Sequence, residues 1–374
     1  KVRSVLLVVL VLLTPVWVSL GTALSDPGLG SSVPARLAEW FRGHGGNWIV
    51  DKVENVWYSH HAPPVGGKPP KGAIPSQTTA TTTPHVVSVA HLTPPDPVPP
   101  IASPAVPGEG QWHAAGRLVH GLPAVYETYM RPDTVHTSVV VGVAWMDTKL
   151  LSARLYSGST IPGSGPWQYT APVSSDAAGS LVAAFNSGFL MKNANGGYFS
   201  EGRTVAPLRE GAASLVITRD GTATVAQWGR DATMAPSVVA VRQNLDLLVD
   251  NGHPVPGLAE NDTAKWGYTL GNKVYVWRSG LGVTADGALV YVGGPGLNIT
   301  DLADVLARAG AVRAMELDIN TDWVNLATFD PTGGAGLATA ANGADLLTNM
   351  SGGPIPTRYF ASWWTRDFVT MSAR

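Results

Sequence analysis

The chain has 374 residues, with 25 basic and 27 acidic side chains and a formal net charge of −2. Because it contains no cysteine, a disulfide scaffold, a cysteine-ligated zinc site and a thiol nucleophile are excluded. Neither sign of charge dominates, so the chain lacks the basic footprint of a nucleic-acid-binding protein, and no nucleic-acid partner is expected.

Residues 4–24 form an uncharged, mostly apolar stretch of 21 residues. As a helix that rises ~1.5 Å per residue it would measure roughly 31 Å, enough to cross a bilayer. Basic residues precede it and Asp26 is the first charge after it, so we expect the bulk of the chain to be extracytoplasmic. A cleaved signal peptide is the alternative, although Gly21-Thr22-Ala23 is a poor cleavage site. Residues 1–25 are therefore predicted to anchor the chain in a membrane.

Residues 26–61 carry apolar and aromatic side chains at helical spacing, which predicts two short amphipathic helices joined at 43–46. The apolar faces would be formed by Leu37, Trp40, Phe41, Trp48, Val53, Val56 and Trp57. Two such helices bury too little surface to form a domain alone. We therefore expect residues 33–60 to lie on a membrane surface or to bind an envelope protein.

Residues 62–110 contain 13 of the 29 prolines and a run of threonines at 78–83, and the pair His60-His61 lies beside them. This composition is typical of a semi-extended linker that forms no core of its own. The linker is predicted to hold the remaining residues, 111–374, away from the membrane.

Residues 111–374 form the predicted head, and their pattern is typical of β structure. Three segments place an Asp-Gly or Asn-Gly turn between apolar or β-branched residues, which predicts tight hairpins at 217–221, 248–252 and 283–287. Further strands are expected over 137–145, 151–156, 181–185, 274–283, 288–292 and 312–317. Thr300 is expected to cap a helix that ends at Gly310. We predict an α+β head dominated by β-sheet.

The common enzyme signatures are missing from the head: it has no G-x-S-x-G elbow, no phosphate-binding G-x-x-x-x-G-K-[ST] loop and no H-E-x-x-H. Polar residues instead follow or interrupt strands beside glycines, namely Asn186, Arg278 and Asp318. Gly280 beside Arg278 indicates either a bound anion or a structural bulge with Arg278 in an ion pair. Glu316 and Asp318 are two residues apart, so on one strand they would share a face and form a carboxylate pair, although Asp318 also suits a turn.

Four segments occur in an order that resembles a known family. They are Ala-Phe-Asn-Ser-Gly-Phe at 184–189, Leu-Val-Asp-Asn-Gly at 248–252, Arg-Ser-Gly-Leu-Gly-Val-Thr-Ala-Asp-Gly at 278–287 and the helix and strand at 302–318. Together they resemble the phosphodiester glycosidase family, and the resemblance covers residues 136–368. It differs from the family pattern at Ser187, where a glycine is usual, and at 319–322, where Ile-Asn-Thr-Asp replaces a glycine-rich loop.

The resemblance implies hydrolysis of a sugar 1-phosphodiester or a related envelope glycan, and no cofactor is expected. With the N-terminal anchor predicted above, the enzyme would be membrane-anchored and extracytoplasmic. Asp318 would act as nucleophile or general base, Glu316 would orient water, and Asn186 would bind a sugar hydroxyl or the phosphate. Arg278 would clamp the phosphate, because its guanidinium matches two phosphate oxygens. The remaining substrate-binding residues implied by the motifs are Ser279, Gly280, Asn320 and Arg358.

Two alternatives remain open. The alternation of Asp318, Asn320 and Asp322 could bind calcium, although the chemistry requires no metal. The head could also be a non-catalytic glycan-binding module or scaffold of the envelope, with tryptophans stacking on sugar rings unless they pack in the core.

Overall fold

The computed structural model describes residues 2–46, 50, 52, 63–74, 89–260, 262–267, 274–331, 336–348, 350 and 356–374. It divides the chain into a smaller unit, Lys1–His61, and a larger unit, Ala62–Arg374, each described here by itself. Three predictions lie outside the described residues: the second amphipathic helix with Trp48, Val53, Val56 and Trp57, the pair His60-His61, and the threonine run.

The smaller unit consists of helix α1 (Val2–Ser25), the turn η1 (Pro27–Leu29) and helix α2 (Val33–Gly43). The indole of Trp40 donates to Ser19 Oγ at 3.0 Å, and Arg36 Nη1 donates to the carbonyl of Leu24 at 3.0 Å. The first predicted amphipathic helix is thus confirmed, and it contacts α1. Binding of residues 33–60 to an envelope protein stays a prediction.

The predicted membrane anchor at residues 4–24 lies within α1. Within the part of the chain that the structure describes, no helix combines the length and apolar character needed to cross a membrane. Anchoring of the chain in a membrane by residues 4–24 stays a prediction.

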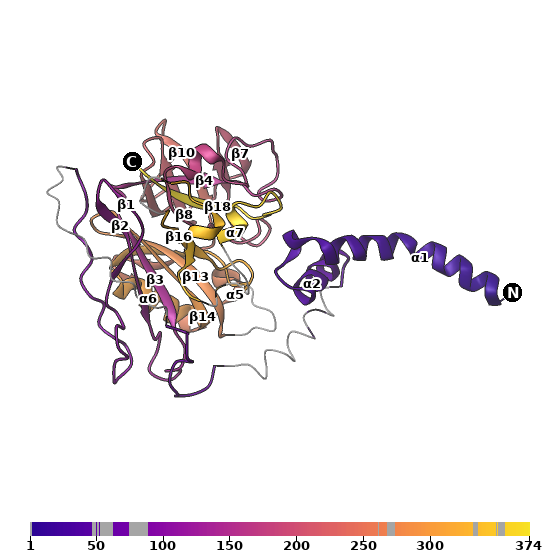
Figure 1. Cartoon of the computed structure of the whole chain (residues 1–374), viewed down its shortest axis with the longest axis horizontal. Coiled ribbons are helices and arrows are strands. Elements are labelled where there is room, and N and C mark those ends of the chain that lie inside the picture. The colour runs from indigo at the N-terminus through magenta and orange to yellow at the C-terminus, as the bar shows by residue number, and fades with distance from the viewer. Residues whose placement is uncertain are drawn as a thin grey trace. The chain divides into compact units, whose positions relative to one another are not determined.

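The larger unit is built from three sheets, in which every pairing between the described strands is antiparallel (Figure 1). The first sheet has the order β1 (His113–Val119), β2 (Leu122–Met130), β3 (Val141–Met146), β14 (Leu289–Leu297), β13 (Val276–Thr284), β15 (Ala311–Glu316), β11 (Leu247–Asp250) and β12 (His253–Pro254). The second has the order β7 (Arg203–Ala206), β6 (Tyr198–Ser200), β10 (Val238–Gln243), β8 (Ala213–Thr218) and β9 (Ala223–Gln227). The third has the order β17 (Gly343–Asp345), β16 (Leu326–Phe329), β5 (Leu181–Asn186), β18 (Phe368–Ala373) and β4 (Leu151–Tyr156).

Short helices connect these strands. They are α4 (Ser175–Ala178), η2 (Leu258–Glu260), α5 (Thr263–Trp266), η4 (Ala340–Asn342) and α7 (Pro356–Tyr359), and the longer α6 (Ile299–Arg308) packs on the first sheet. The predicted α6 is confirmed, but its N-cap is Asn298, whose side chain accepts from the amide of Asp301, and not Thr300. The sheet-dominated head with few helices is confirmed.

The three predicted hairpins are confirmed, since β8 pairs with β9, β11 with β12 and β13 with β14. At the second turn Asn251 and Gly252 have φ of 51° and 80°, which is the left-handed backbone that a two-residue hairpin loop requires. Local turn chemistry therefore sets these pairings.

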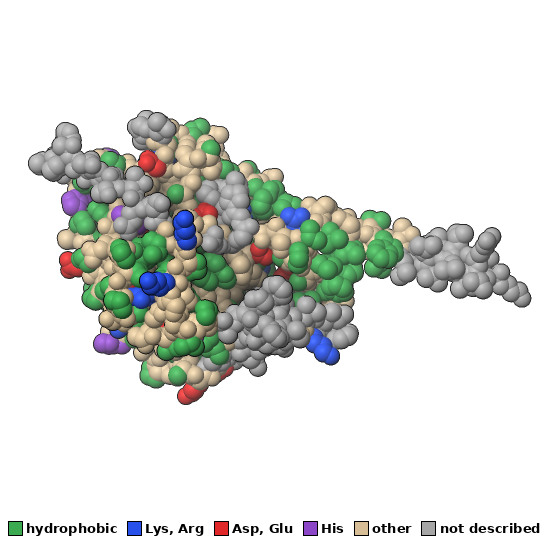
Figure 2. Space-filling model, turned by 60° about the horizontal axis from the view of Figure 1, so that its bottom comes forward, with side chains coloured by type: hydrophobic (Ala, Val, Ile, Leu, Met, Phe, Trp, Pro, Cys, Tyr) green, Lys and Arg blue, Asp and Glu red, His purple; other side chains and the backbone are tan. Residues whose placement is uncertain are grey.

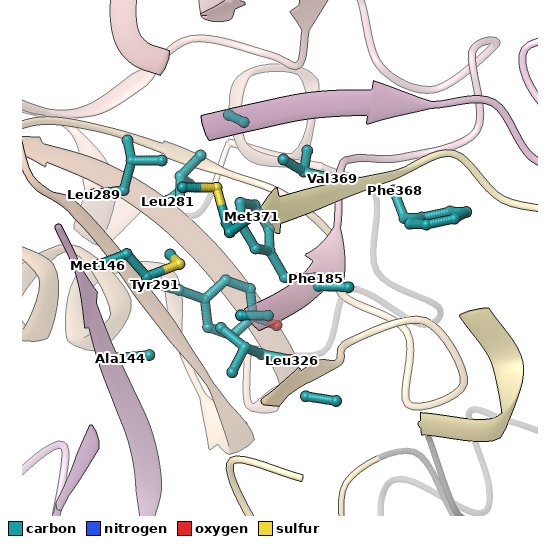
Figure 3. Packing of buried hydrophobic residues seen from close by; sticks show 14 of the residues in the cluster. Ala144, Met146, Phe185, Leu281, Leu289, Tyr291, Leu326, Phe368, Val369 and Met371 are labelled. Carbon is teal, nitrogen blue, oxygen red and sulfur yellow. The ribbon is translucent and has the colours of Figure 1, made fainter. Parts of the chain in front are cut away.

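The main core is formed by side chains from all three sheets, and Figure 3 shows the part between the first and the third. Strand β5 is buried along its whole length, which explains its continuous apolar sequence. The rings of Phe185 in β5 and Tyr291 in β14 lie 5.7 Å apart between centroids. Packing at this point brings the end of β5 against β13 and β14.

The described part of the predicted linker is packed on the head. The amide of Val98, which is 3 % exposed, donates to Gly110 O at 2.9 Å, and Glu109 forms a buried ion pair with Arg131 at 2.8 Å. The folded unit therefore extends beyond the boundary predicted at residue 111. The proline-rich linker has no periodic pattern of its own, and its partners lie both within the linker, at Gly110, and directly after β2, at Arg131.

Replacement of Glu109 by alanine should lower the free energy of unfolding by about 3–5 kcal/mol, because Arg131 would keep a buried charge without its carboxylate. Chemical denaturation of Glu109→Ala beside the exposed control Glu260→Ala measures this. Equal effects of the two substitutions would show that residues before 111 add nothing to the fold.

Candidate functional site

Asn186, the last residue of β5, connects the third sheet to the first. Its Nδ2 donates to Ser279 Oγ at 3.0 Å, and its Oδ1 accepts from the hydroxyl of Tyr291 at 2.9 Å and from the amide of Asn325 at 3.2 Å. The side chain is buried, so each of these bonds replaces water. The structure thus brings two predicted site residues, Asn186 and Ser279, into direct contact.

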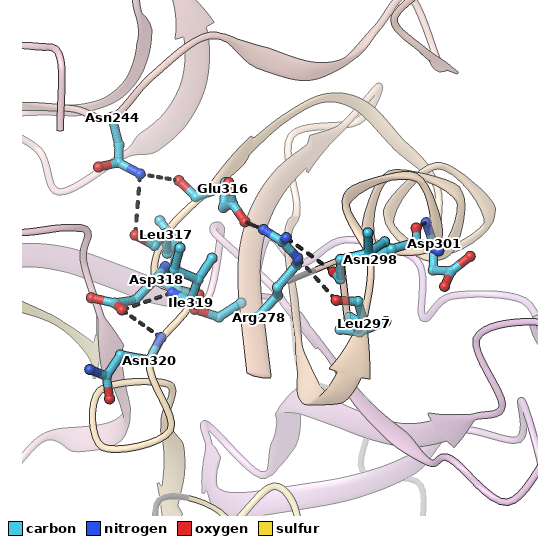
Figure 4. Close-up of polar contacts among 12 residues, drawn as sticks. Asn244, Arg278, Leu297, Asn298, Asp301, Glu316, Leu317, Asp318, Ile319 and Asn320 are labelled. Atoms are coloured by element: carbon cyan, nitrogen blue, oxygen red, sulfur yellow. Dashed lines mark hydrogen bonds and ion pairs between the residues drawn. The ribbon is translucent and has the colours of Figure 1, made fainter. Parts of the chain in front are cut away.

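Asp318 follows β15 and is held by Ser279. The amide of Ser279 donates to Asp318 O at 2.8 Å, and the amide of Asp318 donates to Ser279 Oγ at 3.2 Å. The carboxylate Oδ1 accepts from the amides of Ile319 and Asn320 at 2.8 and 2.9 Å (Figure 4). The loop that departs from the family's glycine-rich pattern therefore turns back onto this carboxylate.

Burial raises the pKa of Asp318 from 3.8 to about 6. The positive charges of Arg366 and Arg242 and the two backbone amides oppose this rise. A carboxyl that changes protonation near physiological pH is suited to acid–base chemistry.

Glu316 and Arg278 form a buried ion pair with 2.6 Å between Oε1 and Nη1. Arg278 Nε also donates to the carbonyl of Leu297 at 3.0 Å. Burial raises the pKa of Glu316, and the ion pair opposes the rise. In Figure 4 the carboxyl groups of Glu316 and Asp318 have different hydrogen-bond partners, but the charge of Asp318 also raises the pKa of Glu316, so the predicted carboxylate pair stays a prediction. The phosphate-binding role of Arg278 stays a prediction, and a phosphate there would compete with Glu316.

Gly280 of β13 serves helix packing. A Cβ on Gly280 would lie 2.8 Å from Leu306 Cδ1 and 3.3 Å from Leu302 Cδ1, both in α6. Only a glycine lets α6 approach the sheet this closely. Gly280 therefore faces the helix, whereas the neighbouring Ser279 reaches Asn186, and this arrangement explains the glycine without a bound anion.

The remaining predicted residues lie in the segments around Asp318. Arg358 Nη1 donates to Asp322 O at 2.5 Å, and its Cζ lies 5.5 Å from the ring centroid of Trp364. Asn320 Oδ1 accepts from the amide of Asp322 at 2.9 Å. Asp318 and Asn320 thus use side-chain oxygens in local turns, and among the described residues no group of three or more His, Asp or Glu is placed to hold a metal ion.

Sequence reasoning missed the residues that the second sheet and the start of β18 supply. Arg242 Nε lies 2.6 Å from Asp367 Oδ2 in a fully buried ion pair, and Asn244 Nδ2 donates to the carbonyls of Glu316 and Leu317 at 2.7 and 3.2 Å. The run Arg-Gln-Asn at 242–244 ends a strand with polar residues, which is the same signal that identified Asn186.

Arg366 was also missed, and it completes the positive charge around Asp318. Its Cζ lies 4.3 Å from the ring centroid of Trp323, and it is 7 % exposed.

On the face shown in Figure 2, charged side chains of the larger unit are few and scattered. The charges of this site are instead buried where the three sheets meet.

Five of the described tryptophans are buried in the larger unit. Trp145, Trp228, Trp266, Trp323 and Trp364 are buried, whereas Trp363 is 36 % exposed. Core packing therefore accounts for these five buried tryptophans, and stacking of the others on a glycan stays a prediction.

Residues 179–318 match the family model of the phosphodiester glycosidases. The matched segment begins before β5 and ends at Asp318, so it includes Asn186, Arg242 and Arg278, while Arg366 lies beyond it. The resemblance predicted from the sequence is thus confirmed over this segment.

The chain is similar to two solved structures at low identity. One is the catalytic domain of zebrafish N-acetylglucosamine-1-phosphodiester alpha-N-acetylglucosaminidase, auto-inhibited by its pro-peptide, with 16 % identity over 71 % of this chain and 88 % of that chain and a TM-score of 0.43. The other is a hypothetical protein from Synechocystis, with 13 % identity over 68 % of this chain and 63 % of that chain and a TM-score of 0.40. Among curated proteins no relative matches.

Replacement of Arg278 by lysine should lower the free energy of unfolding, because lysine loses the bond to Leu297 O and the planar contact with Glu316. Thermal unfolding and calorimetric phosphate binding are measured on the same protein. Unchanged stability with weaker phosphate binding would instead support the phosphate clamp.

Proposed function

We propose that the larger unit hydrolyses sugar 1-phosphodiesters. The observation that carries this proposal is Asp318, a buried carboxyl with a pKa of about 6 beside Arg366 and Arg242. It ends the segment that matches the phosphodiester glycosidase model. A carboxyl with this pKa beside cations suits a reaction that develops positive charge on a sugar and negative charge on a phosphate.

In the proposed reaction the bond between the anomeric carbon and the phosphate oxygen breaks, and the phosphate leaves with the electron pair. Water adds to the anomeric carbon, and the products are a free sugar and a phosphomonoester. Asp318 in its ionised form either takes the proton from this water or first attacks the anomeric carbon itself. A phosphate is a good leaving group, so the reaction needs less acid assistance than that of an ordinary glycoside.

The other residues are assigned by their contacts. Arg366, stacked on Trp323, is the cation proposed to face the phosphate. Asn186 already makes three hydrogen bonds, so we assign it to holding Ser279 in place beside Asp318. Contact of substrate or water with Glu316, Arg278, Asn320 and Arg358 stays a prediction.

Replacement of Asp318 by asparagine should lower turnover of a chromogenic sugar 1-phosphodiester by about 10²–10⁴-fold, because the amide cannot take up a proton or attack. Release of the chromophore by Asp318→Asn is compared with wild type and with Asp330→Asn, an exposed carboxylate. Equal rates for wild type and Asp318→Asn would contradict the assignment. No release by any of them across several sugars would favour the glycan-binding module.

The free energy of unfolding of Asp318→Asn shows whether the variant is folded and also tests the raised pKa of Asp318. The pKa of Asp318 is raised above 3.8, so its contribution to stability is complete at low pH and is lost as the pH rises through about 6. Asparagine does not ionise, so Asp318→Asn keeps this contribution as the pH rises. The free energy of unfolding at neutral pH should therefore be higher than that of the wild type by up to about 3 kcal/mol. Denaturation across this pH range checks it, and a less stable variant would contradict the raised pKa.

We also propose that the larger unit acts outside the cytoplasm on a phosphorylated envelope glycan. Support comes from the uncharged stretch at residues 4–24 and from the proline-rich residues 62–110 that follow. Protease accessibility in intact cells, compared with lysed cells, tests this location. Protection of the larger unit until lysis would contradict it.

A further inference from the structure

The loop of residues 318–325 begins and ends at contacts with Asn186 or its partner Ser279. The amide of Asp318, at the start of the loop, donates to Ser279 Oγ, which also accepts from Asn186 Nδ2. At the end of the loop, the amide of Asn325 donates to Asn186 Oδ1 at 3.2 Å, and the amide of Asn186 donates to Asn325 O at 3.2 Å. One residue of β5 therefore holds both ends of the loop, and the residues between them are held by other contacts.

The side chain of Asn325 holds the middle of the loop. Its Nδ2 donates to Trp323 O at 2.7 Å, and its Oδ1 accepts from the hydroxyl of Tyr359 in α7. Asn325 and Tyr359 are fully buried, so their polar groups depend on each other rather than on water. An amide presents Nδ2 to Trp323 O only while Oδ1 points the other way, and the donated hydroxyl bond fixes this orientation.

The short helix α7 supports the loop through two consecutive residues. Burial raises the pKa of Tyr359 well above its ordinary value of 10, so its hydroxyl keeps the proton that it donates to Asn325. Its ring packs against Phe368 of β18, with 5.0 Å between centroids. The preceding residue, Arg358, donates from Nη1 to Asp322 O at 2.5 Å. Two consecutive carbonyls of the loop are thus supported from α7, one of them through Asn325.

The same loop carries the donors that hold the carboxylate of Asp318. The amides of Ile319 and Asn320 donate to Asp318 Oδ1 at 2.8 and 2.9 Å. The amide of Trp323 donates to Asn320 O at 2.9 Å, so one turn joins these donors to the residue whose carbonyl is held from α7. A continuous series of contacts therefore joins α7 to this carboxylate.

We propose that Tyr359 is a positioning residue that acts through Asn325. It holds the loop 318–325 in the conformation in which backbone amides bind the carboxylate of Asp318. This inference rests on the proposed function, in which that carboxylate must be aligned with water or with the anomeric carbon.

The test measures hydrogen exchange of single backbone amides by NMR on the full chain. Tyr359→Phe removes the hydroxyl and keeps the ring, so Asn325 Oδ1 loses its donor. The amides of Ile319 and Asn320 should then exchange about tenfold faster, because the loop opens locally, and this acceleration should exceed that of the amides in β5.

Turnover of the sugar 1-phosphodiester is measured on the same proteins. In Tyr359→Phe, kcat should fall by on the order of tenfold with a smaller change in KM, because an aligned carboxylate acts mainly in the transition state. A role in stability alone would leave both constants of the folded protein unchanged.

The matched control is Tyr129→Phe, which removes another buried tyrosine hydroxyl that donates to a backbone carbonyl, that of Pro107. It should speed exchange at Ile319 and Asn320 no more than in β5, and kcat should stay at the wild-type value. A loop that opens equally in both variants would show that general loss of stability is the cause.

A double variant separates positioning from stability. Tyr359→Phe with Asn325→Leu leaves no unpaired polar group between the two side chains, so part of the stability lost in Tyr359→Phe should return. Exchange at Ile319 and Asn320 should stay fast, because leucine cannot donate to Trp323 O.

Wild-type exchange at Ile319 and Asn320 in the double variant would overturn the inference, even where Tyr359→Phe alone does not fold. Equal acceleration of the loop and of β5 in Tyr359→Phe would also overturn it, as would a wild-type kcat in that variant. The exchange measurement needs no turnover. Absence of sugar release from the wild type would therefore count against the proposed function, and exchange alone would then decide whether Tyr359 holds the loop.

Discussion

The side-chain amide of Asn186 is the interaction on which the site depends. Its three hydrogen bonds, to Ser279, Tyr291 and Asn325, join the third sheet to the first. Loss of a buried partner leaves the full desolvation cost of the group that remains, about 1–3 kcal/mol for each. Ser279 in turn holds the backbone of Asp318, so the position of the carboxylate is determined by a contact between sheets.

Two buried ion pairs flank Asp318, and each neutralises charge that would otherwise be costly in the interior. Arg278 pairs with Glu316 on the side of α6, and Arg242 pairs with Asp367 where the second and third sheets meet. Such pairs add little net stability, but removal of one partner is strongly destabilising. Asp318 lies near the charge of Arg366 and has no ion pair of its own among the described residues, which suits the proton transfer proposed for it.

The raised pKa of Asp318 means that this carboxyl destabilises the fold at neutral pH. Catalytic groups are commonly held at such a cost, because the environment that tunes them is unfavourable for their charge. The loop after Asp318 partly offsets it through the amides of Ile319 and Asn320. Ile319 and Asn320 thus stand where the family has glycines, and their backbone amides still hold the carboxylate of Asp318.

Local sequence chemistry was sufficient for the hairpins, for α6 and for the placement of Asn186 and Asp318 at strand ends, because turn residues and periodic burial act over a few residues. The same reasoning could not supply Arg242 and Asp367, which are 125 positions apart and meet only when two sheets pack together. It also left open whether Arg278 faced an anion or a carboxylate, since that depends on the strand beside it. A sequence determines which side chains end each strand, whereas only tertiary packing determines which of those ends meet and what charge each one faces.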